Sequence, residues 1–378
     1  MSNIKQKIEA IMRDEGNTRF LSFESFLFVI SLLYWGIIKL RNFLYKKEIL
    51  KSGRLPCKVI SVGNVTVGGT GKTPMTIYMT ELLNRLGYKV VILSRGYKGG
   101  AEKTGGIVSD GRTIFMEPDM AGDEPFMLAE KLKNTPVIVG KNRLEAGMLA
   151  VEKFKPDIIV LDDAFQHLKL ARDINLVLLD SHRPFGNTHI LPRGTLREPL
   201  SALLRGDAFI LTRSDSPPLN PYDLPGLPFS RTDLIGNKPV FRSFHVPYIC
   251  NVVRQNPVAS GYPVSVSYDA EFLKNRNVFA FSGIAKNDDF QRTLEAFGCR
   301  ITGFLKFPDH YQYSDNDLSE IFHSTQELNA DAIITTEKDY VRLVRRITWP
   351  IDLVVISIKI SFGDDDDAFT RFIAQSLY

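Results

Sequence analysis

The sequence predicts an α/β protein with a doubly wound parallel sheet, a second, smaller α/β domain and an apolar helix near its N-terminus. Short, continuous apolar runs recur along most of the chain, as expected for strands that are buried on both faces of a parallel sheet. Segments with helical spacing separate these runs, which is typical of doubly wound sheets. The length of 378 residues favours two domains over one.

The predicted elements alternate in a regular order. Strands are predicted at residues 59–62, 89–94, 137–139, 158–163, 175–180 and 208–212. A second series has strands at 278–282, 332–336 and 353–357 and a helix at 288–297. Because the second series repeats the α/β rhythm on its own, it indicates a separate unit. The predicted division is an N-terminal helix at 1–50, a core at 51–237 and a C-terminal domain with an extended linker at 238–378.

The N-terminal helix is apolar and is followed by basic residues. Residues 20–38 carry one charge, Glu24, and as a helix they would be about 28 Å long, close to the thickness of a hydrocarbon core. Residues 1–60 hold 11 Lys and Arg against 5 Asp and Glu, whereas the rest of the chain holds 36 against 38. This placement of charge, with Tyr34 and Trp35 near the basic end, favours an anionic membrane surface over nucleic acid. The alternative is a docking helix that is buried against the protein.

A glycine-rich loop lies between the first predicted strand and a predicted helix. Its sequence is Gly68-Gly69-Thr70-Gly71-Lys72-Thr73, and Pro74 follows in the first turn of the helix. Backbone N–H groups of such a loop surround phosphate oxygens, the lysine reaches the β- and γ-phosphates and the hydroxyl binds Mg²⁺. The strict pattern has glycine where this chain has Thr66. The loop predicts a P-loop NTPase-like core that binds ATP; the alternative is a plain glycine-rich turn.

Two acidic positions are candidates for phosphoryl-transfer chemistry. Asp162 and Asp163 follow four apolar residues at the end of a predicted strand, where a carboxylate that binds Mg²⁺ belongs. Such a pair can also be a simple helix cap. Asp123 lies in the run Gly122-Asp123-Glu124-Pro125 before a predicted helix. It is either a helix-terminal acid or a general base that takes the proton of an attacking hydroxyl.

Basic side chains offer further candidates. His310 is either a structural histidine or, if the two domains face each other across a cleft, a group that orients Asp123. Arg193 and Arg197 share one loop and suit phosphate contacts, with surface salt bridges as the alternative. Arg95 directly follows a strand, which is a common ligand position in α/β sheets.

Together these residues resemble one family, the tetraacyldisaccharide 4′-kinases of lipid A biosynthesis. The matching motifs are Gly63 to Pro74, Ser94-Arg95-Gly96-Tyr97, Gly122-Asp123-Glu124-Pro125, Asp162-Asp163-Ala164-Phe165-Gln166-His167, Leu191 to Pro199, Phe281-Ser282-Gly283-Ile284-Ala285, Asp309-His310-Tyr311 and Thr336-Glu337-Lys338-Asp339. They cover nearly the whole chain. In this family Thr66 in place of the early glycine is ordinary.

The resemblance implies transfer of the ATP γ-phosphate to the 4′-hydroxyl of a tetraacylated glucosamine disaccharide 1-phosphate, which forms lipid IVA. It implies ATP and Mg²⁺, the cytoplasmic face of the bacterial inner membrane, a monotopic or peripheral attachment and no nucleic acid partner. The catalytic residues it implies are Asp123 as base, His310 and Lys72. The nucleotide-binding residues it implies are Thr66, Val67, Gly68, Gly69, Thr70, Gly71, Lys72 and Thr73. It implies Thr73, Asp162, Asp163 and Glu198 at the metal, and Arg95, His167, Arg193 and Arg197 near substrate or phosphate.

Two other functions compete with this interpretation. A membrane-associated switch ATPase has a similar P-loop but carries a lysine before the glycine pair, where this chain has Val67. A kinase for a soluble metabolite would leave the apolar N-terminus without a purpose. The three cysteines Cys57, Cys250 and Cys299 are widely spaced and form no metal or redox motif, which fits a reducing cytosol.

Overall fold

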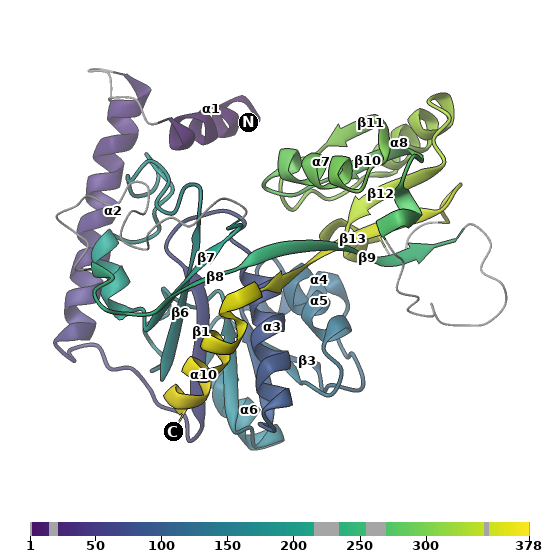
Figure 1. The fold of residues 1–378 in the computed structure, drawn as a ribbon. Helices are drawn as coiled ribbons and strands as arrows, with labels where there is room; N and C mark the ends of the chain where they lie inside the picture. The colour runs from purple at the N-terminus through teal and green to yellow at the C-terminus, as the bar shows by residue number, and fades with distance from the viewer. Residues whose placement is uncertain (1, 15–21, 215–233, 255–269, 344–347, 378) are drawn as a thin grey trace.

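The computed structural model describes residues 2–14, 22–214, 234–254, 270–343 and 348–377, and these form two lobes and a pair of N-terminal helices (Figure 1). The first lobe contains an eight-stranded sheet in the order β3-β4-β2-β5-β1-β6-β7-β8. Its strands are β1 (Lys58–Asn64), β2 (Val90–Ser94), β3 (Gly106–Ser109), β4 (Val137–Val139), β5 (Ile158–Asp162), β6 (Ile174–Asp180), β7 (Ala208–Thr212) and β8 (Val240–Arg242). The neighbours pair in parallel except β3, which is antiparallel to β4.

Helices cover both faces of this sheet, which confirms the predicted doubly wound α/β fold. They are α3 (Lys72–Arg85), α4 (Pro118–Ala121), α5 (Asp123–Lys131) and α6 (Arg143–Phe154), with short 3₁₀ turns at η1 (Gly100–Glu102) and η2 (Leu200–Arg205). Alternate residues of β5 serve opposite faces: Ile158 and Val160 pack with α3, whereas Ile159 and Leu161 pack with α6. Burial on both faces explains why the strands are continuously apolar.

The second lobe contains a five-stranded sheet in the order β11-β10-β12-β13-β9. Its strands are β9 (Phe244–Val253), β10 (Asn277–Ser282), β11 (Arg300–Lys306), β12 (Ala332–Thr336) and β13 (Leu353–Ser361). Its helical segments are η4 (Ala270–Leu273), α7 (Asn287–Ala296), α8 (Asp315–Glu327) and α9 (Glu337–Leu343). The strands β9 and β13 pair antiparallel along their whole length and run from this lobe towards the first (Figure 1).

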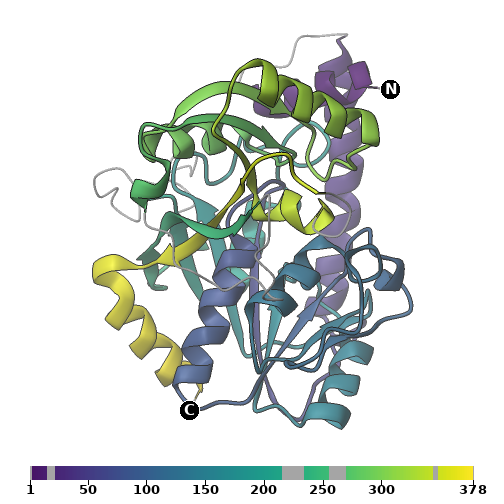
Figure 2. The same ribbon diagram turned by 90° about the vertical axis from the view of Figure 1, so that its right-hand side faces the viewer.

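Two elements beyond residue 237 belong to the first lobe, although the sequence places them in the C-terminal domain. Strand β8 pairs with β7, and α10 (Asp366–Leu377), which follows η5 (Gly363–Asp365), packs on the same sheet. The aromatic rings of Phe362 and Phe369 stack at 4.2 Å within the core that includes Met75 and Met79. The chain therefore leaves the first lobe after β8 and returns to it after β13, and Figure 2 shows α10 beside α3.

The N-terminal helices α1 (Ser2–Arg13) and α2 (Phe23–Lys46) lie against one side of the first lobe (Figure 1). The hydroxyl of Ser22 caps α2 by accepting from the Ser25 amide at 3.3 Å. By length and composition α2 could cross a membrane. Only 17% of its most apolar window is buried within the protein, so most of that window is exposed. Ser31 and Ile38 are buried against the lobe, while the opposite face is apolar and exposed.

Candidate active site

The glycine-rich loop has the conformation of a phosphate cradle. Strand β1 ends at Asn64 and α3 begins at Lys72, as predicted. Gly71 has φ +83°, a left-handed backbone that glycine adopts without strain, and no side chain caps the amides of the helix start. These amides and the positive end of the helix dipole therefore point at the space where an anion would bind.

The start of the loop explains why no glycine is needed at Thr66. Thr66 forms an antiparallel bridge with Leu196, so its backbone is extended and accepts any side chain. The Val67 amide donates to the Thr195 carbonyl at 2.8 Å and is not available to a phosphate. The predicted nucleotide contacts of Thr66 and Val67 thus stay a prediction, and the cradle proper spans residues 68–73.

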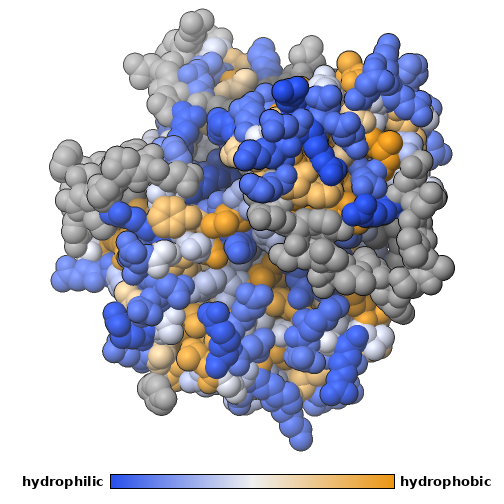
Figure 3. All heavy atoms as spheres, turned by 45° about the vertical axis from the view of Figure 1, so that its right-hand side comes forward, coloured by the Kyte–Doolittle hydropathy of each residue, from blue (hydrophilic) through white to orange (hydrophobic). Residues whose placement is uncertain are grey.

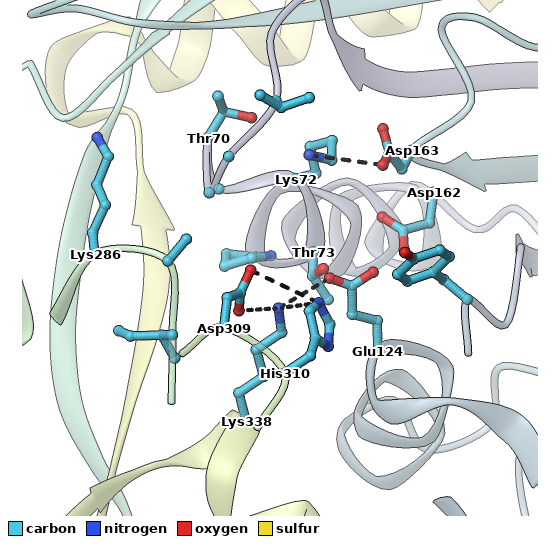
Figure 4. A pocket seen from close by; sticks show the side chains of 18 of the residues that line it. Thr70, Lys72, Thr73, Glu124, Asp162, Asp163, Lys286, Asp309, His310 and Lys338 are labelled. Carbon is cyan, nitrogen blue, oxygen red and sulfur yellow. Dashed lines mark hydrogen bonds and ion pairs between the residues drawn. The ribbon is translucent and has the colours of Figure 1, made fainter. Parts of the chain in front are cut away.

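Two carboxylates meet the loop at the end of β5. Asp162 is buried and accepts from the hydroxyls of Thr76 at 3.0 Å and Ser94 at 3.3 Å. Asp163 accepts from Arg197 Nη1 at 2.8 Å, and its carboxylate lies 3.8 Å from Lys72 Nζ (Figure 4). The structure therefore brings together the lysine, both aspartates and one of the two predicted arginines.

Burial and charge move the pKa values of these two aspartates in opposite directions. Burial raises the pKa of Asp162 well above its usual range, and the neighbouring carboxylates of Glu124 and Asp163 add to the effect. Burial also opposes ionisation of Asp163, but Lys72 and Arg197 outweigh it and lower its pKa. Asp162 and Asp163 are adjacent carboxylates that line the same cavity as Thr73, and such oxygen ligands suit a hard divalent cation, so these residues fit Mg²⁺.

Across the cavity Asp123 contacts His310, a residue of the other lobe. Asp123 is the first residue of α5, and its Oδ2 lies 3.1 Å from His310 Nδ1. The same Oδ2 accepts from Arg342 Nε at 2.9 Å and from Nη2 at 2.7 Å. These donors outweigh the effect of burial and lower the pKa of Asp123 to about 2, so the carboxylate is ionised at neutral pH.

His310 has charged neighbours at both ring nitrogens. Its Nδ1 lies 3.1 Å from Asp123 Oδ2 and 3.2 Å from Arg342 Nη2. Its Nε2 lies 3.4 Å from Lys338 Nζ. Lys338 also lies 3.4 Å from Glu124 and 3.9 Å from Asp309 (Figure 4).

A cavity of about 1740 Å³ joins these groups, and both lobes line it. Figure 3 shows a hollow on a mainly hydrophilic face of the molecule. The predicted residues that line the cavity are Val67, Gly68, Gly69, Thr70, Gly71, Lys72, Thr73, Arg95, Asp162, Asp163, His167, Arg197 and His310. Asp123 lies next to this lining, with a side chain that is 16% exposed.

His167 and Arg95 line the same cavity as the aspartates and His310. Burial, together with the positive charge of Arg143, lowers the pKa of His167 to about 4, so the imidazole is neutral at neutral pH. Arg95 donates from Nε to Glu102 at 2.7 Å while lining the cavity. Both side chains are placed to contact a ligand there.

Arg193 and Glu198, by contrast, hold the N-terminal helices. Arg193 is buried, its amide donates to Ser31 Oγ at 2.9 Å and its Nη1 donates to the Ile11 carbonyl at 2.9 Å. Glu198 is also fully buried, and Arg41 and Arg205 pair with its two carboxylate oxygens. Neither side chain lines the cavity, so in this structure Arg193 contacts the helices and Glu198 contacts two arginines in place of phosphate or metal.

Because Glu198 is buried and pairs with two arginines, we expect it to stabilise the folded protein. We expect Glu198→Gln to lower the free energy of unfolding by about 2 kcal/mol, because two arginines lose a buried partner while staying partly hydrated. The Mg²⁺ concentration that gives half-maximal activity should not change. Denaturant unfolding and a Mg²⁺ titration measure the two quantities, with the exposed Glu145→Gln of α6 as the control. A raised Mg²⁺ requirement at unchanged stability would restore Glu198 to the metal site.

Sequence reasoning missed a second charged group, which contacts the P-loop at Gly69. Asp180, at the end of β6, pairs with Arg213 at 2.5 Å and with Lys286 of the second lobe at 2.7 Å. Arg213 also donates to the Gly69 carbonyl at 2.8 Å. The positive charges of Lys286 and Arg213 lower the pKa of Asp180 to about 2 despite its burial. Asp180 and Arg213 meet because β6 and β7 are neighbouring parallel strands, whereas Lys286 comes from the other lobe, a contact that spacing in the sequence does not reveal.

Comparison with known proteins shows the family of this chain. The family model described as tetraacyldisaccharide-1-P 4′-kinase matches residues 23–378. The chain belongs to this family. It is 40% identical to a tetraacyldisaccharide 4′-kinase of Desulfatibacillum aliphaticivorans over 100% of this chain and 99% of the relative. It is 43% identical to one of Pelobacter propionicus over 85% of this chain and 83% of that relative.

A solved structure gives the same result for the fold. The crystal structure of the LpxK protein of Aquifex aeolicus in complex with ATP superposes with a TM-score of 0.74 and 33% identity. It covers 94% of this chain and 100% of that chain. The resemblance to the 4′-kinase family and the α/β fold with a P-loop core are therefore confirmed.

Proposed function

We propose that this 4′-kinase transfers the γ-phosphate of ATP to the 4′-hydroxyl of a tetraacyldisaccharide 1-phosphate and so forms lipid IVA. The observation that carries the proposal is one cavity in which the P-loop of the first lobe faces His310 of the second. Such a cavity holds a phosphate donor and an acceptor hydroxyl side by side, which phosphoryl transfer requires.

Different residues of the cavity have different roles in the reaction. The amides of residues 68–73 and Lys72 hold the phosphates. Thr73, Asp162 and Asp163 would hold Mg²⁺, which when bound neutralises charge on the transferring phosphoryl group. The 4′-oxygen forms a bond to the γ-phosphorus, the bond to the β–γ bridging oxygen breaks and ADP leaves.

The hydroxyl proton passes to the Asp123–His310 pair, in which Asp123 is the base. Among the described residues all donors to Asp123 reach Oδ2, which leaves Oδ1 to accept the proton. The two cavity-lining arginines, Arg95 and Arg197, and the neutral His167 are placed to contact phosphate or sugar groups of the acceptor.

The exposed apolar face of α2 supports attachment of the enzyme to the membrane that would hold its acylated substrate. Because Ser31, Tyr34 and Arg41 all contact the first lobe, α2 lies along the lobe and embeds in one leaflet without crossing the bilayer. ATP is on the cytosolic side, so we place the enzyme on the cytoplasmic face of the inner membrane.

Transfer of label from γ-labelled ATP to tetraacyldisaccharide 1-phosphate in detergent micelles tests the proposal. We expect a labelled lipid with Mg²⁺ present, none after EDTA is added, and recovery when Mg²⁺ is restored. ATP hydrolysis without labelled lipid, under conditions in which another member of the family labels it, would reject the kinase assignment. Transfer that continues in EDTA would reject the metal assignment alone.

A further inference from the structure

Lys338 of the Thr336-Glu337-Lys338-Asp339 motif contacts His310, and Asp339 of the same motif is linked to Asp123 through Arg342. The motif spans the end of β12 and the first turn of α9, and Arg342 follows one turn later on the same helix. Residues three apart lie on one face of a helix, so Asp339 and Arg342 are neighbours. This geometry ties Asp123 to the interior of the second lobe.

Asp339 is held in place by hydrogen bonds inside the second lobe. It is fully buried, and its carboxylate accepts from Thr336 Oγ1 at 2.6 Å, from Tyr313 OH at 2.9 Å and from the Gly283 amide at 3.1 Å. Arg342 Nη1 adds a fourth donor at 3.1 Å. The Gly283 carbonyl in turn accepts from the His310 amide at 3.2 Å. The same buried network therefore holds both Arg342 and the backbone of His310.

Arg342 connects this buried network to Asp123 of the first lobe. Its side chain is 3% exposed, and two edges of its guanidinium point at different carboxylates: Nη1 at Asp339, and Nε with Nη2 at Asp123. Nη2 also lies 3.2 Å from His310 Nδ1. A planar guanidinium can bridge two carboxylates with fixed geometry, whereas the single ammonium of lysine cannot.

We propose that Arg342 is a positioning residue that sets Asp123 against His310 and completes the proton-accepting pair only when the two lobes are together. The proposal rests on the proposed function. Arg342 does not line the cavity and touches neither the P-loop nor the aspartates of β5 in the described contacts, so it acts on the reaction through Asp123.

The test is a double-mutant cycle in the full-length enzyme. We expect Arg342→Met to lower kcat roughly 10- to 100-fold, the usual cost of a misplaced catalytic group, with the KM for ATP within about twofold. Arg342→Lys should recover only part of the loss, because it keeps the charge and loses the bridge. Arg300→Met, which removes an exposed arginine of β11 in the same lobe that does not line the cavity, is the matched control and should be neutral.

The decisive comparison measures the effect of Arg342→Met in the wild-type enzyme and in the Asp123→Asn enzyme. If Arg342 acts through Asp123, adding Arg342→Met to Asp123→Asn should lower the residual single-turnover rate less than about twofold. A general structural role would instead lower the rate by the same factor in both backgrounds. Should Arg342→Met not fold, the same cycle with Arg342→Lys decides, since the charge stays in place.

Three outcomes would overturn the inference while leaving the kinase assignment intact. They are a normal kcat for Arg342→Met, equal losses in both backgrounds, and a structure of Arg342→Met in which Asp123 keeps its contact with His310. Failure of the kinase assignment would show itself differently, as wild-type enzyme that labels no lipid. The structure of the variant decides on Arg342 in that case too.

Discussion

Asp123→Asn is expected to lower kcat by about 10²- to 10⁴-fold, the range that a positioned general base contributes. The dissociation constant for ATP should stay within about twofold, because the hydrogen bonds of Asp123 in the described part of the chain go to His310 and Arg342 and none goes to the P-loop. The change is nearly isosteric, so it removes the charge and the proton-accepting capacity while keeping the shape. Single-turnover label transfer and equilibrium ATP binding measure the two quantities.

A matched control separates catalysis from local folding. Asp315 is likewise the first residue of a helix, α8, and is exposed, so Asp315→Asn changes the same kind of position without touching the cavity. We expect it to be neutral. Near-normal kcat for Asp123→Asn would remove Asp123 from the role of base, and a parallel loss of ATP affinity would point to a disturbed P-loop.

The depressed pKa of Asp123 predicts the shape of the pH profile. Because its pKa in the folded enzyme is about 2, Asp123 is ionised throughout the range in which the enzyme can be assayed. Protonation of Asp123 therefore causes no loss of rate until the pH falls towards 2. Any decline of kcat between pH 5 and 7 must come from another group.

The sequence could predict the parts of the site that are local in the chain. The P-loop and the aspartates of β5 each follow a strand directly, and parallel strands bring their carboxyl ends to one edge of the sheet. Lys72 and Asp163 therefore meet although 90 residues separate them. The contact between Asp123 and His310 requires the second domain to face the first across a cleft. From the sequence, this arrangement could be stated only as a condition for a role of His310.

Other parts were not predictable because they depend on how separate pieces pack. Arg342 reaches Asp123 only after β9 and β13 have set the angle between the lobes. Arg193 and Glu198 lie in a motif with Arg197, yet the side chains of that motif point in different directions. Arg197 faces Asp163, whereas Arg193 and Glu198 face α1 and α2. A motif thus identified the loop and not which side chains reach the ligand.

Replacing Leu33 and Ile37 of α2 with serine is expected to weaken binding to anionic lipid vesicles roughly 100-fold. Both side chains are 66% exposed, on a stripe that runs along the helix through Phe26, Val29 and Leu40. Withholding two such side chains from a membrane costs about 3 kcal/mol, and each 1.4 kcal/mol is a factor of ten. Turnover on substrate in bilayers should fall with binding, whereas turnover in micelles and ATP affinity should not.

This double substitution is a sharper test than deletion of residues 1–47. Deletion would also remove Ser31 and the Ile11 carbonyl, which are partners of the buried Arg193, and so would confound attachment with stability. The control is Leu86→Ser with Leu328→Ser, two exposed leucines outside α2. Unchanged vesicle binding in the α2 variant would mean that the apolar stripe contacts protein in place of lipid. The attachment of this enzyme would then depend on a partner at the membrane.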